Sequence, residues 1–418
     1  MSTPEKQGQT RIRPLAGLRQ APRLVSPAAA AAGRVALERN GGQRLGRLAA
    51  AVRDHAAQRR RPSRPRMRAL AVGPGGRIGW RDVPAPPPPG PYGALVRPIA
   101  AATCDLDRSL ALGATMFPLP LHLGHECVAE VLAVGDQVTG VRAGQRVVVP
   151  FQISCGACRP CAEGLTGSCA AVPPISMYGF GLGGGHWGGA FSDQLAVPCA
   201  DAMLVPLPAG VGPAAAASVS DTICDGYRHI APHLPGLLAR DPDADVLVIA
   251  SLAARSLFSP STPLYAGLVA RALGARHVFL ADARPAVRGH AARLGLLPLS
   301  PPELRRQRPA ALVADISATP HGLRAALAKT APDGICSSAG TLHRTVRIST
   351  LAMYGRNVTF HIGRTHARAL IPHVLDLMAA SRLHPEQVIT RTAPLDDAPR
   401  ALREHLRSQD TKTIITAQ

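Results

Sequence analysis

Aromatic and acidic residues are scarce in this chain, and long apolar runs are missing from it. Aromatic residues make up 3% of the 418 residues, and 27 Asp and Glu stand against 47 Lys and Arg. No apolar run reaches the 18 or more residues of a membrane-spanning helix, which argues against an integral membrane protein. The hydrophobic content of 46% still suffices for a sizeable core, and the length favours one large domain or two ordinary ones.

The formal net charge of +20 raises the question of a nucleic-acid partner, but its distribution argues against one. Residues 1–66 hold 15 Lys or Arg and only three acids, a net +12, so the other 352 residues carry +8. We expect residues 1–66 to be a disordered Arg- and Ala-rich extension or an over-long translation start. A transit peptide or a nucleic-acid-binding arm is the alternative. Because no secretory pattern accompanies the segment, we expect a cytoplasmic protein.

Four of the nine cysteines lie close together in CGACRPCAEGLTGSC. Thiolates at this spacing on a tight loop can converge on one ion, and four protein ligands suit a structural Zn²⁺ site. An iron–sulfur cluster also uses four thiolates, whereas disulfides are disfavoured without a secretory signal. We therefore predict structural zinc at Cys155, Cys158, Cys161 and Cys169.

A second set of candidate ligands is spread along the chain. Cys104 follows an apolar run, His125 and Glu126 stand between Gly124 and a Val-rich run, and Asp221 lies far downstream. Cys, His and an acid together make a three-ligand set that leaves a fourth position for water or substrate, as in catalytic zinc sites. Spacing alone makes this a weak signal.

The order of the motifs strengthens that signal. A GHE triplet precedes a Val-rich run with VGD, then AGQRVVV, the four-cysteine loop, a Gly-rich stretch and GGAFSDQLAVP. This order resembles the zinc-dependent medium-chain alcohol dehydrogenases, a family that includes formaldehyde and polyol dehydrogenases, from about Met67 to the C-terminus. The resemblance implies an α/β fold, in which a GroES-like β-barrel catalytic domain is joined to a Rossmann-type doubly wound parallel sheet.

The resemblance also assigns roles to residues. Cys104, His125 and Asp221 correspond to the catalytic zinc ligands, and Glu126 to the acid beside the zinc. The Asp ligand points to the branch similar to formaldehyde and polyol dehydrogenases. Many relatives carry a Ser or Thr two residues after the first ligand, which passes the substrate proton outward. Leu106 stands there, so Asp107 or a water is left for that role.

The resemblance implies a division of the chain and an assembly. We expect a GroES-like domain with the structural zinc lobe at 67–221, a Rossmann domain at 222–363 and a C-terminal return to the catalytic domain at 364–418. Relatives are commonly dimers or tetramers through their Rossmann domains, so a homodimer or homotetramer is expected.

Alternation of apolar runs with a helical pattern supports the parallel sheet independently. LYAGLVARALGA at 264–275 places its apolar residues on one helical face. Continuous apolar runs of the kind found in buried parallel strands occur at 245–250, 277–282, 311–317, 334–340 and 358–363.

Asp282 ends the second of these strands, where an acid binds the ribose hydroxyls of NAD and repels the extra phosphate of NADP. Arg284 weakens that inference, because an Arg nearby can accept the same phosphate. We expect NAD rather than NADP.

The first loop of this half contains no glycine. Dinucleotide sites use glycines there so that the backbone can approach the pyrophosphate, whereas residues 250–263 read ASLAARSLFSPSTP. Ser261 and Thr262 can supply hydroxyls and a helix cap instead. Either the phosphates bind through a remodelled loop, or this chain binds dinucleotide weakly.

The resulting hypothesis is a zinc-dependent oxidoreductase that transfers hydride between an alcohol or aldehyde and NAD(P). The alternative is a catalytically degenerate zinc-binding homologue that no longer binds dinucleotide. A protein that binds nucleic acid through its Arg-rich extension is the third possibility, and the one the sequence favours least.

Overall fold

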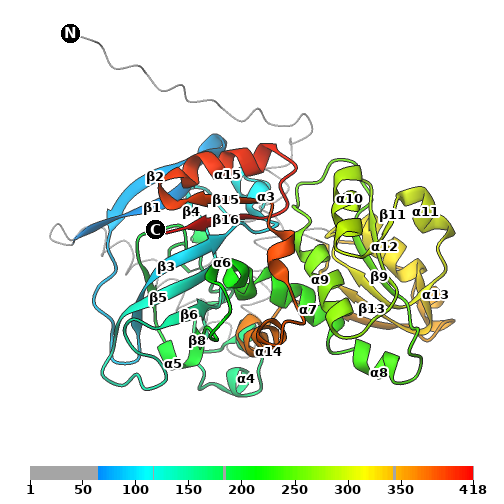
Figure 1. The fold of residues 1–418 in the computed structure, drawn as a ribbon, viewed down its shortest axis with the longest axis horizontal. Helices are drawn as coiled ribbons and strands as arrows, with labels where there is room; N and C mark the ends of the chain where they lie inside the picture. The colour runs from blue at the N-terminus through cyan, green and yellow to red at the C-terminus, as the bar shows by residue number, and fades with distance from the viewer. Residues whose placement is uncertain (1–64, 116, 182–184, 342–344, 418) are drawn as a thin grey trace, which may run out of the picture.

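The computed structural model describes residues 65–115, 117–181, 185–341 and 345–417, so the predicted extension lies almost wholly outside the described residues. Figure 1 shows two lobes side by side, one around strand β3 (Ala94–Ala102) and the other around strand β9 (Val246–Ser251). None of the described helices is long and apolar enough to cross a membrane.

Two mainly antiparallel sheets form the first lobe. Valines that alternate along its strands, such as Val96, Val128 and Val148, are fully buried between the layers. The larger sheet has the order β15 (Arg391–Pro394), β16 (Thr413–Thr416), β3, β5 (Glu126–Val134), β6 (Arg146–Val149) and β8 (Val205–Pro206), and β7 (Leu195–Val197) pairs with β3. The smaller sheet has the order β2 (Arg77–Pro84), β1 (Arg66–Gly73) and β4 (Leu121–His122).

The end of the chain returns to this first lobe after the second is complete. Helix α14 (Ala367–Ala379) packs against α7 (Thr222–Ile230). Strand β16 then pairs antiparallel with β3, with Ile414 opposite Ala102. The C-terminal strand therefore lies beside the segment that carries Cys104.

The second lobe is a six-stranded parallel sheet with helices packed on it. Its order is β11 (Leu297–Leu299), β10 (Val278–Asp282), β9, β12 (Ala310–Asp315), β13 (Thr330–Ser338) and β14 (Thr359–Ile362). The chain adds strands first on one side of β9 and then on the other, which is the doubly wound order with its switch point beside β9. Its helices are α8 (Leu234–Leu238), α9 (Ser261–Ala272), α10 (Pro285–Arg293), α11 (Pro301–Arg306), α12 (Pro320–Ala328) and α13 (Thr350–Tyr354).

All the predicted parallel strands are present, and α9 contains most of the predicted helical run at 264–275. The helix starts at Ser261, so Ser261 and Thr262, which the sequence offered as cap residues, lie in its first turn. The helix starts there because a carboxylate of the first lobe, that of Asp105, accepts its first N–H groups. The other short helices are α3 (Asp107–Ala111), α4 (Arg159–Ala162), α5 (Ala200–Met203), α6 (Pro213–Ala216) and α15 (Ala398–Arg407), with 3-10 turns η1 (Pro74–Gly76), η2 (Thr166–Ser168), η4 (Ala217–Ser220), η5 (Pro385–Val388) and η6 (Leu395–Asp397).

Candidate active site

Four candidate ligands from three separate segments converge at the inner edge of the first lobe. One ligand atom from each of Cys104, His125, Glu126 and Asp221 lies within 4.8 Å of the others. Pairing of β3 with β5, with Ala102 opposite Glu126, brings Cys104 beside His125. Asp221 enters from the junction of η4 and α7. The sheet register therefore brings Cys104 to His125, and the junction before α7 adds Asp221, which lies 117 positions after Cys104.

The distances within this group suit coordination of one small cation. Asp221 Oδ2 lies 3.2 Å from His125 Nε2 and 3.6 Å from Cys104 Sγ. Burial, followed by the nearby Asp221 and Glu126, raises the pKa of the Cys104 thiol well above its usual range. A divalent cation would relieve this crowding of acidic groups, and one thiolate, one imidazole and one carboxylate make a donor set typical of catalytic zinc.

Gly124 makes the turn that places His125. Its φ of +93° lies in the left-handed region, and a Cβ atom there would meet Phe191 at 2.7 Å. Only glycine fits such a position. The His125 ring is enclosed by Phe180 and Phe151, with ring centroids 4.9 and 5.8 Å away, so its orientation is fixed by packing.

Glu126 is held by a lysine that the sequence analysis missed. Lys412 Nζ donates to Glu126 Oε2 at 2.9 Å and to Thr222 Oγ1 at 2.9 Å, and both charged side chains are fully buried. Burial raises the pKa of Glu126 to about 7, although Lys412 opposes the shift. The available signal was composition, because Lys412 is one of only three lysines in an Arg-rich chain.

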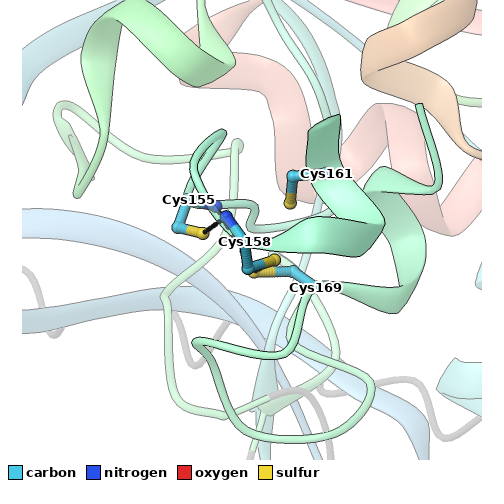
Figure 2. A group of neighbouring side chains, drawn as sticks. All are labelled: Cys155, Cys158, Cys161 and Cys169. Carbon is cyan, nitrogen blue, oxygen red and sulfur yellow. Dashed lines mark hydrogen bonds between the residues drawn. The ribbon is translucent and has the colours of Figure 1, made fainter. Parts of the chain in front are cut away.

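The four-cysteine loop folds into a second group of converging ligands. Its sulfur atoms face a common space beside α4 (Figure 2), and all lie within 4.8 Å of one another. Backbone N–H groups of Cys158, Ala170 and Cys155 donate to three of the four sulfurs. Such bonds stabilise a thiolate, whereas burial raises the pKa of Cys161 and of Cys169. Burial acts in the same direction at Cys158, but the N–H groups of Cys161 and Ala170 still lower its pKa to about 6. All nine cysteines are free of disulfides.

A cavity of about 320 Å³ opens beside Cys104 and Asp221. Its wall is mostly apolar, and Leu106 forms part of it, at the position where many relatives carry a hydroxyl. Asp107, the other proton carrier considered, is buried, and its carboxylate accepts the Cys104 N–H at 2.9 Å. The other apolar wall residues near the candidate metal are Phe117, Phe151, Ile175, Met177 and Phe180.

The N-terminus of α9, where the sequence predicts dinucleotide phosphates, already has an acid against it. The carboxylate of Asp105 accepts the Ser261 N–H at 3.1 Å, the Ser261 hydroxyl, and the Thr262 N–H at 2.9 Å. The Asp105 carbonyl accepts the Ser259 N–H at 3.3 Å. This cap explains why α9 starts at Ser261. Ser261 and Thr262 thus bind Asp105 here, and their role in cofactor binding stays a prediction.

Asp282 is also paired within the chain. It ends β10 as predicted and is fully buried. Its two carboxylate oxygens accept from Arg284 Nε at 2.9 Å and Nη2 at 2.7 Å, and the Arg284 N–H donates at 2.7 Å. Arg284 Nη1 in turn donates to the Phe258 carbonyl in the glycine-free loop. The residues of this half therefore do not fit a dinucleotide in the expected pose unless these pairs open.

Comparisons with known proteins agree with this architecture. Residues 90–209 match the alcohol dehydrogenase GroES-like domain. A "Probable zinc-binding alcohol dehydrogenase" of Mycobacterium tuberculosis is 29% identical over 339 residues, which cover 79% of this chain and 83% of the relative. "Medium chain reductase/dehydrogenase ucsI" of Acremonium sp is 30% identical over 243 residues, covering 56% of this chain and 78% of the relative.

A solved structure supports the same fold. Alcohol dehydrogenase TADH from Thermus sp. ATN1 superposes with a TM-score of 0.74 and 28% identity, covering 84% of this chain and 100% of that one. The predicted fold class, a GroES-like domain with a Rossmann-type sheet, is confirmed.

Proposed function

Because the chain belongs to the zinc-dependent medium-chain alcohol dehydrogenase family, we propose that it oxidises apolar alcohols or reduces the matching aldehydes at a zinc site held by Cys104, His125 and Asp221. The observation that carries the proposal is the convergence of these three ligand atoms beside a cavity with a mostly apolar wall. Zinc in such a site acts as a Lewis acid on the substrate oxygen. Hydride transfer with a nicotinamide dinucleotide is the reaction class that belongs with this family.

The residues around the metal position the ligands and exclude water. Phe151 and Phe180 pack on the His125 ring and also line the cavity, so a substrate carbon chain or ring would displace water from the same apolar surface. Lys412 neutralises Glu126 directly behind the ligands. That pairing leaves Glu126 Oε1, which is buried and accepts no hydrogen bond from the described residues, as the group that can approach the metal.

The proposal includes a second metal site and a choice of nucleotide. A structural zinc ion is held by Cys155, Cys158, Cys161 and Cys169, supported by the converging sulfurs. NAD is preferred over NADP, supported by the place of Asp282 at the end of β10, where its carboxylate can bind ribose hydroxyls once Arg284 releases it.

We also propose that the chain forms a homodimer or homotetramer through the outer edge of the parallel sheet. β14 is the last strand of that sheet. Large apolar side chains nearby are exposed, with Leu351 at 78%, Tyr354 at 82% and Ile362 at 59%. Exposed apolar groups beside an open strand edge suit pairing with a second copy.

The test combines metal content and turnover in the His125→Ala variant. We expect zinc to fall from about two to about one per chain and kcat/KM for apolar alcohols to fall about a thousandfold, because losing a ligand removes several kcal/mol of Lewis-acid stabilisation. His384→Ala, at an exposed histidine paired with Glu386, is the matched control. Turnover and zinc content in His125→Ala equal to those of the control would defeat the assignment.

The alternative, a zinc-binding homologue without dinucleotide chemistry, is favoured by two observations, the position of Asp105 against α9 and the pairing of Asp282 with Arg284. The experiment in the next subsection separates this alternative from the proposed function.

A further inference from the structure

We propose that Asp105 occupies the phosphate position of the dinucleotide fold in this chain, and that it sets the affinity for any ligand whose pyrophosphate must reach the N-terminus of α9. The inference rests on the proposed function, since it concerns the cofactor of the same site. Asp105 belongs to the first lobe, and it controls cofactor binding at a helix of the second lobe.

The first step is the chemistry of the helix end. The first N–H groups of a helix have no partners within the helix, and with the helix dipole they attract anions. In α9 these donors are those of Ser261 and Thr262, and both residues are buried. Each N–H already donates to a carboxylate oxygen of Asp105. The chain's own anion thus takes the bonds that phosphate oxygens take in dinucleotide sites.

The second step is the place of this contact between two cavities. Asp105 and Thr262 line the cavity at the candidate metal, whereas Ser259 and Pro260 line a second cavity of about 360 Å³. Phe258 lines both. The contact between Asp105 and the start of α9 therefore forms part of the wall between the two cavities. A dinucleotide in a doubly wound sheet crosses at the switch point, so it would have to pass through this wall.

The third step is the charge of the second cavity. Four arginines line it, of which Arg284 is paired with Asp282, together with one lining acid, Asp410, which is paired with Arg391. The Arg108 guanidinium donates to the carbonyls of Ser256 and Ser408. Guanidinium groups are the side chains best suited to phosphate recognition. The arginines of this cavity thus suit the adenylate end of a dinucleotide. Asp105 repels the pyrophosphate that would connect that end to the metal cavity. The four arginines are Arg108, Arg255, Arg284 and Arg407.

The experiment uses the zinc-replete full chain and isothermal titration with NADH, ADP and adenosine. In Asp105→Asn, the shape of the side chain is retained while its charge is lost. Asp201→Asn is the matched control, because Asp201 makes nearly the same set of bonds, to the N–H groups of Thr139 and Gly140 and to the Thr139 hydroxyl, away from both cavities. We expect Asp105→Asn to bind NADH and ADP about tenfold more tightly than the unaltered chain, a change of about 1.4 kcal/mol. Adenosine, which lacks phosphate, should bind equally to all three proteins.

Each other outcome overturns the inference in a distinguishable way. If the unaltered chain binds NADH and Asp105→Asn binds it no more tightly, the inference fails while the proposed function stands. If neither binds NADH or ADP although both retain two zinc ions, the inference fails together with the dinucleotide part of the proposed function. A tenfold gain that also appears with adenosine or in Asp201→Asn is a general effect and equally excludes the inference. Thermal melting and zinc content verify folding, and Asp105→Ser, whose shorter side chain cannot reach both N–H groups, replaces Asp105→Asn if that variant does not fold.

Discussion

The metal side and the nucleotide side of the junction between the two lobes differ in how their charged groups are satisfied. On the metal side, Cys104, His125 and Asp221 direct ligand atoms at one another within 4.8 Å. On the nucleotide side, Asp105 and Asp282 each accept several N–H bonds from the chain itself. Acidic ligand atoms that face each other repel one another, and a bound cation relieves this repulsion. A carboxylate that already accepts hydrogen bonds from the chain needs no further partner. The metal side can therefore bind its cation directly, whereas the nucleotide side must first break hydrogen bonds within the chain before a cofactor can bind.

The largest expected effect tests whether the metal side depends on the lysine paired with Glu126. Lys412→Met removes the partner of Glu126 and leaves a buried carboxylate unpaired, which should cost about 3–5 kcal/mol of unfolding free energy. Urea denaturation of zinc-replete protein measures the loss. The double variant Glu126→Gln with Lys412→Met should recover most of it, because no buried charge is then left unpaired.

The control for this prediction is an ion pair of the same kind on the surface. Arg400→Met removes the exposed partner of Asp397 and Glu404, so the loss should be far smaller than in Lys412→Met. A loss in Lys412→Met as small as in Arg400→Met would mean that Glu126 does not need its lysine and would remove one contrast between the two sides.

These contacts also show which parts of the molecule sequence patterns could predict. The parallel strands and the four-cysteine loop are encoded by neighbouring residues, so periodicity and spacing sufficed for them. The pair of Lys412 with Glu126 joins residues 286 positions apart, and the contact of Asp105 with Ser261 spans 156 positions. Neither leaves a local pattern, because each depends on how the two lobes and the C-terminal strand meet. The cap of α9 was missed for this reason: the sequence offered Ser261 and Thr262, whereas the carboxylate that accepts the first N–H groups belongs to Asp105 in the other lobe.

The second prediction concerns a neutral group on the nucleotide side. His405 is buried, and its ring contacts Ser259 Oγ at 3.2 Å and Thr413 Oγ1 at 3.0 Å, which ties the glycine-free loop to β16. Burial, followed by the positive charge of Lys412, lowers the pKa of His405 to about 3. The unfolded chain takes up this proton near pH 6.5 while the folded chain does not, so the stability is fully present above pH 6.5 and is lost as the pH falls toward 3.

Integrated from pH 7.5 to pH 5, this linkage costs about 2 kcal/mol. Unfolding free energies of the unaltered chain and of His405→Gln, measured across that range, should therefore converge as the pH falls. His384→Gln, at a surface histidine, is the control. If His405→Gln keeps the same pH slope as the unaltered chain, His405 is not the group that takes up the proton.

The smallest expected effect tests whether the pairing of Asp282 governs the choice of nucleotide. Arg284→Ala removes the guanidinium that occupies both oxygens of Asp282. The freed carboxylate can then accept ribose hydroxyls and repel a 2′-phosphate, so the ratio of NADH to NADPH affinity should rise about fivefold, or about 1 kcal/mol. Arg288→Ala is the matched control, because Arg288 donates to the backbone carbonyl of the same Asp282 and leaves its carboxylate paired.

An equal ratio of NADH to NADPH affinity in the two variants would show that removing any cation from this turn has the same effect. In that case the carboxylate of Asp282 does not select the nucleotide, and the contrast between the metal side and the nucleotide side would rest on Asp105 alone.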